Sequence, residues 1–89
     1  MSPEEEIRRS GRAREILEND LFVEAVAAIE EALKQARLNS GAVDVALREK
    51  LCAQEVALHS ILKNLQTHIE TGELAKRTLM DKAKEFFQP

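Results

Sequence analysis

Tryptophan and tyrosine are absent from this sequence, and phenylalanine occurs three times in 89 residues. Small-molecule pockets are usually walled by aromatic side chains around a few convergent polar groups, and little here could build one. The sequence also lacks the motifs G-x-x-x-x-G-K-[ST], G-x-G-x-x-G, G-x-S-x-G and C-x-x-C, which mark common nucleotide-binding and catalytic sites. We therefore expect neither an enzyme nor a cofactor.

Cysteine is nearly absent too. Cys52 is the single one, so no internal disulfide can form, and an unpaired thiol suits a reducing compartment. His59 and His68 are nine residues apart, which puts them on opposite sides of a helix. Cys52 and His59 share a side, but two ligands do not make a zinc site. We expect no metal.

Long apolar runs are missing, and so is a strong net charge. No stretch of about 18 apolar residues occurs, so we expect no membrane span. The first residues are acidic, where a signal peptide would be basic and then apolar, and we expect an intracellular protein. The net charge of −3 offers no general attraction to nucleic acid or anionic membranes.

The residues that remain are typical of long helices. The hydrophobic fraction is 44% and the charged fraction 33%, with Ala, Glu, Leu, Lys and Arg prominent, a mixture found in coiled coils. The length fits one domain, residues 1–89. Since so short a chain builds a small core and lacks disulfides, we expect oligomerisation or a partner to support it.

Capping and turn residues divide the chain into four predicted helices. Ser2 followed by Pro3 favours a start, and Asn19-Asp20 marks the next boundary. Gly41 could provide a left-handed helix end, Asp44 is the expected cap of the following helix, and Gly72 indicates a kink or break. The predicted segments are a weak N-terminal helix at 1–18, two hairpin helices at 20–38 and 44–71, and a C-terminal helix at 73–87.

Two apolar stripes alternate spacings of three and four residues, the heptad pattern of coiled coils. They consist of Phe22, Val26, Ile29, Leu33 and Ala36, and of Leu47, Leu51, Gln54, Leu58, Ile61, Leu65 and His68. The loop between them is short, so the helices should fold back antiparallel. The predicted fold is an all-α, coiled-coil-like helical hairpin. Its polar stripe positions, Gln54 and His68, either set the register or reach solvent.

Apolar residues outside these stripes are the candidates for self-association or partner binding. They are Leu21, Ala25, Ala28, Ala32, Val56, Leu62, Ile69, Leu79, Phe86 and Phe87. Phe86 and Phe87 are adjacent on a helix and cannot both face one core, so one of them could anchor in a neighbouring protein. The alternative is one buried and one partly exposed ring.

An arginine cluster near the N-terminus is the candidate for nucleic-acid contact. Its members are Arg8, Arg9, Arg12 and Arg14, which could contact phosphates. Acidic residues outnumber them within residues 1–20, and pairs such as Glu4–Arg8 fit helix-stabilising salt bridges. We do not expect nucleic acid as the main partner.

Residues 12–25, RAREILENDLFVEA, resemble a segment of short helical proteins of tailed bacteriophages and prophages. Asp44 with Arg48-Glu49, and residues 69–75 (IETGELA), extend the resemblance over about residues 12–75. This chain has Asp20 where proline is common, and it lacks a tryptophan that many of those proteins carry. Such proteins tend to be encoded among virion structural and packaging genes, and most have no assigned activity.

The resemblance implies a phage setting, in the host cytoplasm or associated with the virion. Our leading hypothesis is a non-enzymatic, homo-oligomeric helical protein that binds itself or a larger phage assembly. One alternative is an accessory nucleic-acid-binding packaging factor. Another is an inhibitor of a host defence protein, since acidic helical proteins can occupy basic grooves.

Overall fold

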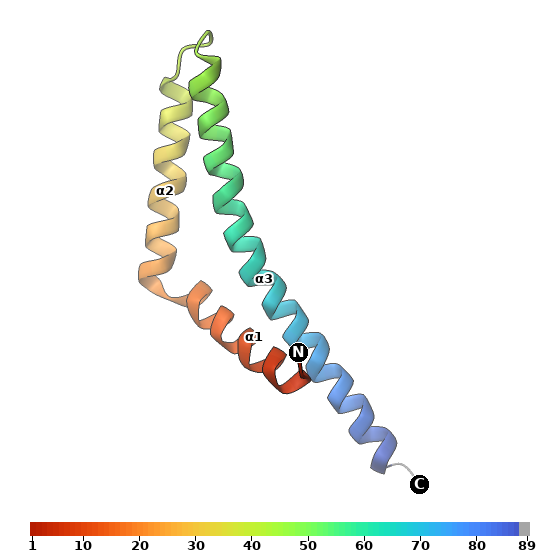
Figure 1. Ribbon diagram of the computed structural model, residues 1–89. Coiled ribbons are helices and arrows are strands. Elements are labelled where there is room, and N and C mark those ends of the chain that lie inside the picture. Colours follow the sequence, from red (N-terminus) through yellow and green to blue (C-terminus); the bar gives the residue numbers. More distant parts are fainter. Residues whose placement is uncertain (88–89) are drawn as a thin grey trace.

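The computed structural model describes the backbone of residues 1–87 and the side chains of residues 1–86. Three helices follow one another: α1 (Pro3–Glu18), α2 (Asp20–Asn39) and α3 (Val45–Phe87) (Figure 1). Residues 1–87 contain no strand. The predicted all-α class is therefore confirmed. The packing of α2 and α3, which are joined by a short loop, is compatible with a helical hairpin.

The three helix starts lie where the sequence predicts them. The Ser2 side chain accepts a hydrogen bond from the backbone N–H of Glu5 at 3.2 Å, and Pro3 opens α1. The Asn19 side chain accepts from the N–H of Phe22 at 3.0 Å, and Asp44 accepts from the N–H of Leu47 at 3.1 Å. Each side chain satisfies an N–H that has no partner inside its own helix.

The predicted end of α2 near Leu38 agrees with the observed end at Asn39, but the predicted left-handed cap at Gly41 and the predicted break at Gly72 are wrong. Gly41 does not adopt the left-handed conformation, since no residue of the described chain has a positive φ. Ser40 instead caps α2 in an extended conformation, and its hydroxyl donates a 2.7 Å hydrogen bond to the carbonyl of Arg37. Gly72 does not break the chain either. The predicted helices 44–71 and 73–87 are one continuous helix, α3.

Gly72 lies inside α3 because α1 crosses that helix there. Ser10 and Ala13 of α1 are 1% and 3% exposed, and Ala75 of α3 is 6% exposed. A methyl group on Gly72 would collide with Cβ of Ser10 and lie 3.0 Å from the backbone oxygen of Glu6. The tightest packing in the molecule thus joins α1 to α3. From the sequence we expected only a weak N-terminal helix, and its contact with α3 at Gly72 was not predicted.

The contact between α2 and α3 is looser and rotated from the predicted register. Leu51 is buried, and Leu58, Leu62 and Leu65 are half-buried. Ile61, which the heptad pattern places inside, is 56% exposed. The inner row of α3 thus shifts by about one position toward Leu62 and Ile69 along the helix, as expected when a helix of 3.6 residues per turn drifts from a strict heptad.

The molecule is long and thin, with principal extents of 71 × 25 × 18 Å. Its radius of gyration is 19.6 Å, whereas a compact domain of 89 residues has one of about 12 Å. α1 and α2 each lie along a different part of α3, and the C-terminal end of α3 extends past α1 (Figure 1). Most side chains therefore contact one neighbouring helix at most.

Candidate protein-binding surface

The predicted contact residues divide into an exposed group and a partly covered group. On α2, Leu21 is 75% exposed, and the small residues that follow it on the same side are exposed too. On α3, Leu62, Ile69 and Leu79 are half-buried within the chain, and their role in self-association or partner binding stays a prediction. The exposed members are Leu21, Ala25, Ala28, Ala32, Val56 and Phe86, and the side chain of Phe87 lies outside the described residues.

Charged residues line one side of the contact between α2 and α3. Arg37 of α2 donates a hydrogen bond from Nη1 to Oε1 of Glu55 on α3, at 2.8 Å. Glu30 and Lys34 of α2 and His59 of α3 border the same shallow hollow. We call this side of the hairpin the charged flank.

The opposite side of the same contact is apolar. On α2 the contact line follows Val26 and Leu33, and each residue turns the helix by about 100°. Glu30, Lys34 and Arg37 therefore lie to one side of this line, and alanines and Ile29 to the other. The same geometry on α3 separates Glu55 and His59 from Ile61.

We call this second side the uncharged flank. Its residues are Leu21, Ala25, Ile29, Ala32 and Ala36 of α2 and Leu47, Gln54, Ala57 and Ile61 of α3. Helical geometry adds one charged side chain, Lys50, whose long stem can carry its ammonium group out to water. Ile29 and Ile61 are 49% and 56% exposed. Sequence reasoning assigned both to the interior, and the shifted register is what turns them outward.

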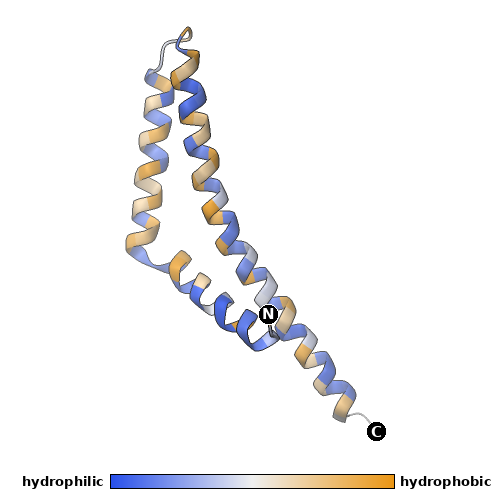
Figure 2. Ribbon diagram, viewed as in Figure 1, coloured by the Kyte–Doolittle hydropathy of each residue, from blue (hydrophilic) through white to orange (hydrophobic). Residues whose placement is uncertain are grey.

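The colours of Figure 2 show a difference in hydropathy between α1 and α2. α2 is mostly apolar along its length, whereas much of α1 is hydrophilic. Nevertheless, α2 contains no buried residue. Its apolar side chains are therefore only partly covered by α1 and α3.

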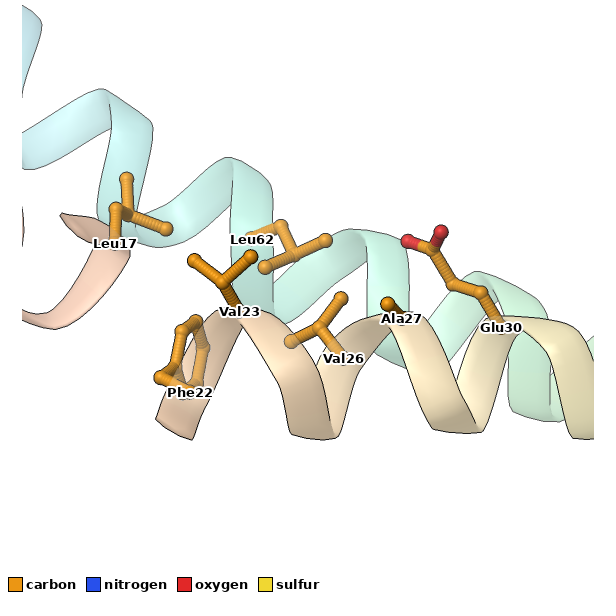
Figure 3. A pocket seen from close by; sticks show the side chains of 7 residues that line it. All are labelled: Leu17, Phe22, Val23, Val26, Ala27, Glu30 and Leu62. Carbon is orange, nitrogen blue, oxygen red and sulfur yellow. The ribbon is translucent and has the colours of Figure 1, made fainter. Parts of the chain in front are cut away.

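A hollow of about 220 Å³ opens where the end of α1, the start of α2 and the middle of α3 meet. Leu17, Val23, Val26 and Leu62 converge on it in Figure 3, with Glu30 at one end of the row. Phe22 and Ala27 complete the lining. A wall of this kind suits an apolar side chain of a partner, because six of its seven residues offer only hydrocarbon.

The four arginines do not form one surface. Arg14 lies beside α3, where its Nη2 donates to Oε1 of Glu73 at 2.9 Å. Arg8, Arg9 and Arg12 are exposed, and the four-residue spacing of Arg8 and Arg12 places them on one side of α1. Contact between these three and nucleic acid stays a prediction, and the steep weakening of such binding with salt would detect it.

No protein-family model, curated protein or solved structure matches this chain. Within residues 1–86, no three His, Cys, Asp or Glu side chains are grouped to hold a metal ion. None of the described helices is long and apolar enough to span a membrane.

Proposed function

We propose that this chain is a phage-encoded, non-enzymatic helical protein that binds protein surfaces, including copies of itself, during virion assembly or packaging. One observation carries the protein-binding part of this proposal. The chain exposes 7042 Å², whereas a compact monomer of its 10.0 kDa exposes about 5,200 Å². Apolar side chains contribute to that surface, with Leu21, Ile29 and Ile61 being 75%, 49% and 56% exposed, and contiguous exposed apolar patches mark interaction sites.

The arrangement proposed for α2 and α3 is an antiparallel, coiled-coil-like hairpin. Arg37, near the end of α2, pairs with Glu55, near the start of α3. Farther from the loop, Val26 and Leu62 border the same hollow. Contacts that move backward along α2 while moving forward along α3 support opposite helix directions. α1 then packs against α3 beyond the open end of this hairpin.

The phage setting rests on the resemblance of residues 12–75 to phage helical proteins. Its test is a phage that carries this gene with and without an early stop codon. Loss of the chain should lower the yield of infectious particles and leave unfinished ones, and a plasmid-borne copy should restore the yield. An unchanged yield, together with absence of the chain from purified particles and assembly intermediates, would reject the proposal.

A further inference from the structure

The uncharged flank of the hairpin is an apolar surface that the helices of the described chain leave largely exposed. More than half of the 20 residues of α2 are apolar, and none of them is buried. An isolated helix gains little stability from backbone propensity, and most helical stability in proteins comes from packing an apolar face. α2 therefore needs a covering surface that α1 and α3 do not supply.

The chain as a whole exposes enough area for a stable interface. The 7042 Å² of this chain exceeds the area expected for a compact monomer by about 1,800 Å². A standard stable complex buries about 800 Å² on each partner. The area that one partner buries in a standard interface is therefore smaller than the excess exposed area of this chain.

We infer that a second copy of this chain covers the uncharged flank, so that two hairpins form a four-helix bundle. The inference rests on the proposed function and names the occupant of one surface. In a twofold dimer the same patch of both copies meets itself. The alanines of α2 allow helices to approach within the 8–10 Å typical of helix pairs, and Ile29, Leu47 and Ile61 supply the larger side chains of a bundle core.

Charge favours this flank as the surface through which two copies meet. Each chain carries a net charge of −3, so two copies repel wherever their charged surfaces meet. Pairing through the uncharged flank leaves Glu30, Lys34, Arg37 and Glu55 in solvent on the outer sides of the bundle. The two copies then desolvate few charges, and Lys50 can extend past the edge.

The test compares two exposed alanines on different sides of the hairpin. Ala32 lies on the uncharged flank of α2, whereas Ala53 lies on the side of α3 that faces away from α2. Ala32→Glu places a carboxylate in the interface, and two copies bring both carboxylates there. We expect dimerisation at least about 100-fold weaker. Ala53→Glu should leave it unchanged.

The measurement is the mass in solution by light scattering after size exclusion, across a series of concentrations. The wild type and Ala53→Glu should reach twice the 10.0 kDa of one chain, and Ala32→Glu should stay at the single-chain mass. Glutamate is a good helix former, so circular dichroism at concentrations where the wild type is monomeric should show similar helical content in both variants. A loss of helix in Ala32→Glu alone would be resolved with the smaller change Ala32→Ser.

Three results would overturn the inference: a wild type that stays monomeric at every concentration, a larger oligomer, or equal dimerisation of both variants. These results differ from a failure of the proposed function. A purified chain that is monomeric and yet enters phage particles would reject the dimer and the self-association in the proposed function, and would leave its binding to a phage assembly standing. A chain that dimerises but occurs in no phage particle or assembly intermediate would support the dimer and count against a role in virion assembly.

Discussion

Ser10 and Gly72 form the closest approach between two helices of this protein, and the absence of a side chain at Gly72 makes it possible. Gly72→Ala should gain about 1 kcal/mol of helix propensity. Its methyl group would meet Cβ of Ser10 and the backbone oxygen of Glu6, neither of which a side-chain rotation can move. Since overpacking costs about 1–3 kcal/mol, we expect a net loss of stability in urea unfolding at a fixed protein concentration.

Gly11 provides the matched control for that substitution. It too lies inside a helix, but a Cβ there would have no atom within 4 Å. Gly11→Ala should therefore stabilise the protein by up to about 1 kcal/mol. The swap Ser10→Gly with Gly72→Ala should recover part of the loss. If Gly72→Ala and Gly11→Ala shifted the urea midpoint equally upward, α1 would not pack on Gly72.

At the scale of the helix, Asn19 serves two elements at once. Its side chain caps α2, and its backbone N–H donates to the carbonyl of Ile16 at 3.2 Å and so closes α1. Asn19→Ala keeps the second bond and removes the first. The expected loss is about 1 kcal/mol, measured by urea unfolding. Asn39→Ala, at the last position of α2, removes no cap and should not destabilise; equal losses in the two variants would contradict this account.

The helix starts could be predicted from sequence because a cap is a local device. Ser2, Asn19 and Asp44 each bond an N–H three residues ahead, and no distant residue is needed. Gly72 could not be assigned in the same way. A glycine between two helical stretches is compatible with a break in the helix and also with the close approach of a second helix. Only the position of α1 distinguishes these two cases. The sequence did contain one signal of this contact. Ser10 and Ala13 are small residues three positions apart, and Gly72 and Ala75 have the same spacing, so each pair lies on one side of its helix.

The register of α2 against α3 was predicted only in part. Heptad spacing located the rows with Phe22, Val26, Leu33, Leu51 and Leu58, all of which are at least half-buried. The heptad spacing placed Ile61 in the contact with α2 and Leu62 outside it. In the structure Ile61 is 56% exposed and Leu62 is half-buried. Both residues are aliphatic, so hydrophobicity does not distinguish them. Small rotations of a long helix decide which one faces its neighbour, and these depend on α1 as well as α2.

Hydrogen exchange should show that α2 is the least protected of the three helices in a single chain. It has no buried residue, whereas α1 packs through Ser10 and Ala13. At concentrations where the chain is monomeric, amides of α2 should exchange faster than those near Ser10 and Gly72, because local opening is easiest where few apolar contacts are lost. Raising the concentration should protect α2 most. Protection of α2 that is independent of concentration would argue against a covered flank.

For the whole molecule, folding and association should be coupled. A thin chain that buries few side chains gains a large share of its stability from whatever binds the folded form alone. For a dimer of this length, the thermal midpoint should rise by roughly 4 °C for each tenfold increase in protein concentration, given the usual unfolding entropy per residue. The midpoint of Ala32→Glu should not change over the same range. A wild-type midpoint that stays constant would mean that α1 and α3 stabilise α2 without a second copy, and that the exposed flank is kept for a different protein.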